Sequence, residues 1–157
     1  MQEITLSGPR GLRLTNAYLG GLIDGEGSLG LYKSKTSYRP RLAVSMIGKR
    51  EHALLSLIAQ LYGGRFYTYR RSTGQVVHTW EVAALRDLRS VLYTVLPHLM
   101  LKRDQASILY YWCNLPSTRR KEEAPSVSAQ LKHIKANTKG RLIGAIGESH
   151  GMVESCS

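Results

Sequence analysis

The chain's architecture follows from one run of residues, Ala17-Tyr18-Leu19-Gly20-Gly21-Leu22-Ile23-Asp24-Gly25-Glu26-Gly27-Ser28. Its apolar side chains recur at helical spacing, and they predict a helix from Leu14 to Asp24. Gly25 and Gly27 favour an abrupt exit from that helix into a strand. Glu26 is then expected to project where the helix meets the strand.

The rest of the 157-residue chain alternates between strand and helix periods, which predicts an α+β fold. We expect strands at 28–33, 39–47, 65–71 and 76–83, and helices at 50–62, 85–98 and 103–114. Residues 118–125 are interpreted as a charged loop and 126–136 as a short helix. The order predicts one domain over 1–145, a four-stranded antiparallel sheet backed by helices on one face, and a flexible tail at 146–157.

Positive charge is concentrated on the two predicted hairpins. The chain carries 22 Lys and Arg against 11 Asp and Glu, a formal charge of +11. Between Glu26 and Glu81 there are nine cations, and Glu51 is the only acid. A strand with Arg opposite its apolar stripe cannot be buried on both sides. The basic, tyrosine-rich face therefore favours a nucleic-acid partner, because a β-ribbon fits the major groove of DNA.

Several classes are excluded by composition. No apolar run reaches the roughly 18 residues of a membrane-spanning helix, and we expect no membrane partner. The first residues have neither the charged start nor the apolar run of a signal peptide. Cys113 and Cys156 are far apart without Cys-x-x-Cys spacing, which gives no support to a zinc site or a disulfide framework.

The run Ala17–Ser28 resembles the signature of the LAGLIDADG homing endonucleases, single-motif homodimeric type. A second run, Leu99-Met100-Leu101-Lys102-Arg103-Asp104-Gln105-Ala106, is similar to the family's L-x-L-K-x-x-Q-A element. The likeness covers about residues 14–145. It implies the αββαββα fold, in which the four-stranded sheet forms a saddle for DNA.

The resemblance also implies an active site. Glu26 would ligate a metal ion through its carboxylate and Gly25 through its carbonyl. Lys102 would polarise water or stabilise charge on the phosphate, as a cation there should. The implied cofactor is Mg²⁺, with Mn²⁺ or Ca²⁺ able to substitute, Ca²⁺ without cleavage. The carboxylate is a hard oxygen ligand suited to these ions.

Two positions depart from the family pattern. Relatives usually carry Asp where this chain has Glu26. A Gln that organises water in close relatives falls at Gly48 here, or at Ile47 if the alignment slips by one residue. Water positioning is then expected to fall to Lys49, Arg50 or Lys102, and we count Lys49 among the candidate catalytic residues.

One carboxylate per chain makes a poor metal site, so we expect a homodimer that brings two together. Gly20 and Gly21 lack side-chain bulk, and two such helices can approach closely. The candidate interface residues are Leu19, Gly20, Gly21, Ile23 and Asp24. A two-fold protein implies a near-palindromic target.

The sheet should hold the side chains that contact DNA. Side chains at alternate strand positions would contact base edges, and those around them would contact phosphates. Candidates for base edges are Arg39, Arg41, Arg70 and Glu81, with Tyr32, Ser34, Ser45, Thr68 and Thr79 on compatible strand faces. Candidates for phosphates are Lys33, Lys35, Arg71, Lys139 and Arg141.

The sequence thus favours an intron-encoded, homodimeric, site-specific endonuclease that makes metal-dependent double-strand breaks in a long DNA site. Two alternatives stay open: a DNA-binding regulator of the same fold without cleavage, and an RNA maturase that uses the same basic surface. We expect an intracellular protein, in a prokaryotic or archaeal cytoplasm or in a chloroplast or mitochondrion.

Overall fold

The computed structural model describes the backbone of residues 6–7 and 13–148, and the side chains of residues 14–137. A two-residue strand pair, β1 (Leu6–Ser7) with β2 (Arg13–Leu14), precedes the main unit. That unit comprises α1 (Asn16–Glu26), β3 (Gly27–Ser34), β4 (Ser37–Met46), α2 (Lys49–Tyr62), β5 (Arg65–Arg70), β6 (Val76–Val82), α3 (Leu85–Val95), the 3₁₀ turn η1 (Leu96–His98), α4 (Arg103–Asn114) and α5 (Ser117–Glu148). The predicted α+β class and the four strands are confirmed.

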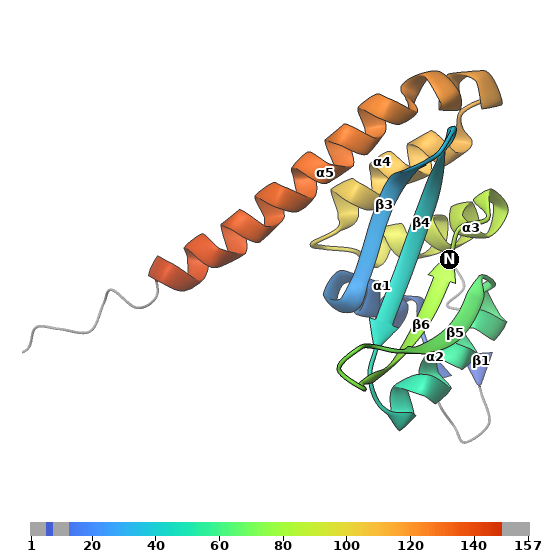
Figure 1. The fold of residues 1–157 in the computed structure, drawn as a ribbon, viewed down its shortest axis with the longest axis vertical. Coiled ribbons are helices and arrows are strands. Elements are labelled where there is room, and N and C mark those ends of the chain that lie inside the picture. Colours follow the sequence, from blue (N-terminus) through green and yellow to red (C-terminus); the bar gives the residue numbers. More distant parts are fainter. Residues whose placement is uncertain (1–5, 8–12, 149–157) are drawn as a thin grey trace, which may run out of the picture.

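The sheet is antiparallel throughout, in the order β3-β4-β6-β5. Helices α1 and α3 lie behind it in Figure 1, while α5 begins beside it and extends far beyond it. The apolar face of the sheet, with Leu29, Leu42 and Trp80 fully buried, packs on the helices. We call the opposite side, which bears Tyr32 and Arg41, the open face of the sheet.

The first helix is longer than the sequence predicted. It begins at Asn16, where the Thr15 hydroxyl accepts a hydrogen bond from the Tyr18 N–H at 3.1 Å, and ends at Glu26 rather than Asp24. The true exit is Gly27, whose N–H donates to the Ile23 carbonyl. A side chain at Gly27 would collide with that same carbonyl, so the close approach requires glycine.

Two other predicted boundaries were wrong. The single helix expected at 85–98 divides into α3 and η1, because Pro97 has no N–H for another α-helical turn. The loop expected at 118–125 and the short helix at 126–136 are one continuous helix, α5. Apolar residues at Ala124, Val127 and Leu131 give α5 a buried stripe, which the surrounding charges obscured in the sequence.

The same helix continues past residue 145, where the sequence predicts the end of the domain, and that domain boundary stays a prediction. Residues 146–148, assigned to the tail, continue α5, and the remainder of that predicted tail lies outside the described residues. The first half of the helix is bound to the sheet, because the Ser128 hydroxyl donates to the Leu31 carbonyl at 2.7 Å. In the described part of the chain, no helix is both long and apolar enough to cross a membrane.

Candidate functional site

The C-terminal end of α1 is tied to the loop that precedes α4. The Asp24 carboxylate accepts hydrogen bonds from the backbone N–H groups of Met100 (2.6 Å), Leu101 (3.2 Å) and Lys102 (2.9 Å). Three donors to one ionised group are strong hydrogen bonds that fix both segments. Asp24 therefore acts as an internal clamp between two elements far apart in the sequence.

Lys102 lies at the same corner. Its ammonium donates to the Asp24 carbonyl, and it also interacts electrostatically with Glu26. Burial lowers the pKa of Lys102, and the positive charge of Lys135 adds to that effect. Asp24 and Glu26 oppose it, but the net pKa stays below the ordinary lysine value. The structure thus brings together Glu26 and Lys102, the two principal residues of the predicted active site.

The oxygen donors at this corner suit a hard divalent cation, but they are few. Glu26 is exposed at the last position of α1, next to the exposed Gly25. No group of three or more His, Cys, Asp and Glu able to hold a metal ion occurs among the described residues. Oxygen donors of this kind suit Mg²⁺, but a single chain has too few of them for a complete site. We call Asp24, Gly25, Glu26 and Lys102 the acid–lysine corner.

The region of the missing Gln lies at the start of α2. Gly48 has a φ of 128°, a backbone conformation that residues with a side chain rarely adopt. Glycine is therefore the residue that this turn accommodates. Lys49 is exposed at the first position of α2, and its side chain has no hydrogen bond or ion pair within residues 14–137. Its catalytic role stays a prediction.

Three of the predicted interface residues face the chain's own core instead. Leu19 and Ile23 are 0% exposed. A Cβ at Gly20 would lie 2.7 Å from the Cβ of His98, so this glycine admits η1 rather than a partner. These assignments were wrong because the apolar stripe of α1 is needed by its own domain.

The other side of α1 is uncovered in the single chain. Ala17, Gly21 and Gly25 are exposed at intervals of four residues, and Tyr18 is 49% exposed beside them. A Cβ added at Gly21 or Gly25 would meet nothing within 4 Å. Ala17, Tyr18 and Gly25 were missed as interface candidates, although the four-residue spacing was available in the sequence.

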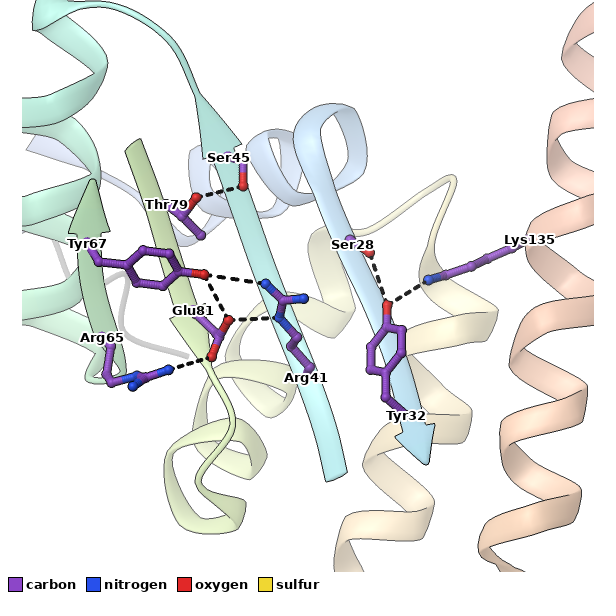
Figure 2. Close-up of polar contacts among 9 residues, drawn as sticks. All are labelled: Ser28, Tyr32, Arg41, Ser45, Arg65, Tyr67, Thr79, Glu81 and Lys135. Carbon is purple, nitrogen blue, oxygen red and sulfur yellow. Dashed lines mark hydrogen bonds and ion pairs between the residues drawn. The ribbon is translucent and has the colours of Figure 1, made fainter. Parts of the chain in front are cut away.

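Four charged and phenolic side chains form a network at the middle of the open face (Figure 2). The Glu81 carboxylate contacts Arg41 Nε at 2.8 Å through Oε2 and Arg65 Nη2 at 3.0 Å through Oε1. The Tyr67 hydroxyl donates to Glu81 Oε2 at 3.1 Å and accepts from Arg41 Nη2 at 3.5 Å. We call these four residues the Glu81 network.

The electrostatics of the network favour ionised partners. Burial would raise the pKa of Glu81, but hydrogen bonds from Arg65 and Tyr67 and the charges of Arg41 and Arg65 hold it below the ordinary value. Burial likewise opposes the charge on Arg41, yet Glu81 and Tyr67 raise its pKa overall. Glu81 therefore stays a carboxylate that attracts two guanidinium groups on a face expected to meet DNA.

Two smaller polar groups flank the network. Tyr32 lies between Ser28, 3.4 Å away, and the Lys135 ammonium of α5, which also stands over its ring. Burial raises the pKa of Tyr32, but Ser28 and Lys135 outweigh that effect and lower it. The Ser45 and Thr79 hydroxyls are 2.9 Å apart. Both groups link neighbouring elements across the open face, as Figure 2 shows.

The strand register separates the predicted DNA-contacting residues into two sets. Pairs such as Tyr32 with Arg39, Ser45 with Thr79, and Ala43 with Glu81 share the open face. This face bears Tyr32, Ser34, Arg39, Arg41, Ser45, Thr79 and Glu81, as expected. Lys33 and Lys35 are exposed at the end of the first hairpin, Arg71 is exposed at the second turn, and the side chains of Lys139 and Arg141 lie outside the described residues.

Thr68 and Arg70 were assigned to the wrong face. Thr68 pairs with His78, which is buried on the helix side, and its hydroxyl lies 2.8 Å from His78 Nδ1. Arg70 shares that parity and donates to the Gly74 carbonyl at 2.9 Å. The residues that actually occupy the open face of β5 are Arg65, Tyr67 and Tyr69, and all three were missed.

The cause is a one-residue difference in the turn. A four-residue turn at 72–75 was expected, whereas Arg71 N donates to Gln75 O and Gly74 N donates to Arg71 O, which closes a three-residue loop. Gly74 has a φ of 84°, the left-handed conformation that such a loop needs. A register shift of one residue moves every side chain to the other face.

The arrangement of helices and strands is similar to that of several solved homing endonucleases. No family model and no curated protein matches the sequence. The solved structure of I-CvuI, a homing endonuclease bound to its target with Ca, matches at a TM-score of 0.63 and 23% identity, covering 76% of this chain and 80% of that one. The archaeal intron-encoded homing endonuclease I-Vdi141I, complexed with DNA, matches at a TM-score of 0.59 and 16% identity. That match covers 76% of this chain and 82% of that one.

A LAGLIDADG meganuclease bound to uncleaved DNA, I-AabMI, is also similar, at a TM-score of 0.54 and 18% identity. The match covers 70% of this chain but 39% of that one. All of these likenesses concern the arrangement of helices and strands. The chain has the LAGLIDADG homing endonuclease fold, in agreement with the resemblance of its sequence.

Proposed function

We propose that this chain is one half of a homodimeric, site-specific endonuclease that makes metal-dependent double-strand breaks in a long, near-palindromic DNA site. The observation that carries the proposal is the acid–lysine corner. There the exposed Glu26 carboxylate interacts electrostatically with the half-buried Lys102, at the end of helix α1, which has one exposed side. The open face of the sheet on the same fold supplies the DNA-binding surface.

Dimerisation is supported by the uncovered side of α1. None of the described residues requires glycine at Gly21 or Gly25, since a Cβ at either position meets nothing within 4 Å. A second α1 crossing at this side would require small residues, because two backbones can approach closely only where side chains are absent. A two-fold axis there would place two Glu26 carboxylates near each other and provide the missing donors.

The residues that would hold a divalent ion, Mg²⁺ or a substitute such as Mn²⁺, are Glu26 through its carboxylate and Gly25 through its carbonyl. Such an ion, when bound, lowers the pKa of a water molecule and neutralises charge on a phosphodiester. Asp24 is occupied by three backbone donors and positions the corner instead. Lys102 would stabilise negative charge that develops on the cleaved phosphate.

The open face would lie along the major groove of one half-site. Its width and alternating side chains suit base reading, with Arg39 and Arg41 as candidates for contacts with base edges. Lys33, Lys35 and Arg71 are exposed around the hairpin ends, where they suit phosphate contacts. The binding free energy should therefore depend steeply on salt concentration.

The test is cleavage of a randomised, palindrome-enriched plasmid library in Mg²⁺, followed by sequencing of the cut ends. Wild type should yield double-strand cuts at one long site, and Glu26→Gln should yield none while it still binds that site in Ca²⁺. Glu122→Gln is the matched control, because Glu122 is an exposed carboxylate on α5 away from the corner. Loss of binding together with cutting would give Glu26 a structural role.

A second candidate is a DNA-binding regulator of the same fold without cleavage, and Gly48 is the observation that favours it. The φ of 128° at Gly48 disfavours the Gln side chain that the resemblance implies, and the organisation of water would then be weaker. A site that is enriched by filter binding but never cut would support this candidate. Preferential competition by RNA would instead favour a maturase.

A further inference from the structure

We propose that Arg41 reads a guanine through the free end of its guanidinium group, and that Glu81 is the positioning residue that aims it. This inference rests on the proposed DNA-binding function and names the base that the middle of each sheet selects. It also replaces the expectation that Glu81 itself contacts a base edge.

The geometry of Arg41 leaves one edge of its guanidinium available. Nε faces Glu81 Oε2 at 2.8 Å and Nη2 faces the Tyr67 hydroxyl at 3.5 Å, so the side edge of the group is occupied. Within residues 14–137, Nη1 has no hydrogen bond, and Figure 2 shows it turned away from Glu81 and Tyr67. The two terminal nitrogens can then approach O6 and N7 of a guanine end-on.

The contact with Glu81 is an ion pair rather than an aligned hydrogen bond. The Arg41 Nε atom is buried and has no hydrogen-bond partner among the described residues, despite its 2.8 Å distance from the carboxylate. Attraction between the two charges is therefore the force that orients the guanidinium. The Arg41 side chain remains 43% exposed, which leaves its free end accessible from the open face.

Glu81 is poorly placed to read a base itself. Its side chain is only 12% exposed. Oε1 accepts from Arg65, and Oε2 faces both Arg41 and Tyr67. A cytosine amino group would have to displace one of these partners, whereas a guanine can meet Arg41 without disturbing the network. Because the arginine is held before DNA arrives, little side-chain entropy is lost on contact.

The experiment measures the affinity of the full chain, in Ca²⁺, for the wild-type target and for every single base-pair substitution in it. Wild type should lose about tenfold or more when one guanine in each half-site is replaced. Arg41→Lys keeps the charge but lacks the planar end, and it should reduce that preference severalfold at that position alone. Glu81→Gln should reduce the preference at the same position, since it removes the charge that orients Arg41.

The control is Arg39→Lys, because Arg39 is exposed on the same face and its side chain has no hydrogen bond or ion pair within residues 14–137. It should leave the guanine preference at the Arg41 position unchanged. The double variant Arg41→Lys/Glu81→Gln should lose little more than Arg41→Lys alone, as expected for residues that act as one unit. Melting temperatures of all variants confirm that each is folded.

Three results would overturn the inference. Glu81→Gln could alter a different base from Arg41→Lys, which would make Glu81 a reader in its own right. Either variant could weaken all sites equally, which would make the network structural. Wild type could discriminate bases without preferring guanine at the Arg41 position. If wild type enriches no site at all, the proposed function itself fails, a result that the wild-type measurement alone reveals.

Discussion

The acid–lysine corner and the open face of the sheet are built in different ways. At the corner, the Asp24 carboxylate accepts hydrogen bonds from three consecutive backbone N–H groups more than 70 residues away. These bonds also position Lys102, which is the third donor. On the sheet, positions follow from strand register, and contacts such as those of Arg41 with Glu81 are shared among several strands. Loss of one side chain at the corner should therefore abolish cleavage. Loss of one side chain on the sheet should only weaken DNA binding.

The largest effect is expected from the uncovered side of α1. Gly21→Leu should leave the chain folded, because a Cβ there meets nothing within 4 Å and leucine favours helix by about 1 kcal/mol over glycine. It should abolish dimerisation and cutting, because the added side chain separates two helices that must touch. Sedimentation velocity and plasmid cleavage measure both effects.

Gly20 provides the matched contrast on the opposite side of the same helix. Gly20→Ala should destabilise the single chain by about 1 to 3 kcal/mol through overpacking, since its Cβ would lie 2.7 Å from that of His98. Chemical denaturation gives the free energy of unfolding. A dimer that persists in Gly21→Leu would place the partner elsewhere.

The next effect concerns the clamp at the corner. Asp24→Ala leaves three backbone N–H groups without their acceptor, and we expect a loss of about 2 to 3 kcal/mol in the free energy of unfolding. Cleavage should fall by more than this destabilisation explains, because Lys102 is no longer held beside Glu26. Equal single-turnover rates for the folded variant and wild type would show that the clamp has no part in catalysis.

A smaller effect should follow from the pKa of Lys102. Burial lowers this pKa, so the ammonium loses its proton at a lower pH than an ordinary lysine does. The part of the cleavage rate that depends on its charge is present below that pKa and lost as pH rises through it. Lys102→Arg stays charged and should lack this alkaline fall. Identical pH profiles for the two proteins would argue against an electrostatic role for Lys102.

The smallest effect is expected at the rim of the sheet. Lys33 is exposed at the end of the first hairpin, where one phosphate contact is expected. Lys33→Ala should weaken binding to all sequences alike and reduce the slope of log affinity against log salt by about 0.9. Equilibrium titrations at several salt concentrations check this value. A change confined to one base pair would make Lys33 a base reader instead.

The same contrast explains what could be predicted from the sequence. The position of the corner was predictable because its residues stand at fixed positions of two recognisable runs, and the structure ties the second run to Asp24. The catalytic roles of Glu26 and Lys102 stay predictions. Which side chains of β5 lie on the open face was not predictable. Their placement depends on whether the turn has three or four residues, and a glycine at position 74 is compatible with either length. The exposed side of α1 was not identified, because an apolar stripe in the sequence does not reveal whether it packs on its own domain or on a partner.

The central claim is that one chain holds an incomplete active site, which a second copy completes. Mixed dimers of wild type and Glu26→Gln, purified through two different tags, test it most directly on the selected target in Mg²⁺. The account predicts that such dimers bind the target as wild type does but make almost no double-strand breaks, because the two carboxylates serve one site. Double-strand cutting by mixed dimers at the wild-type rate would contradict it.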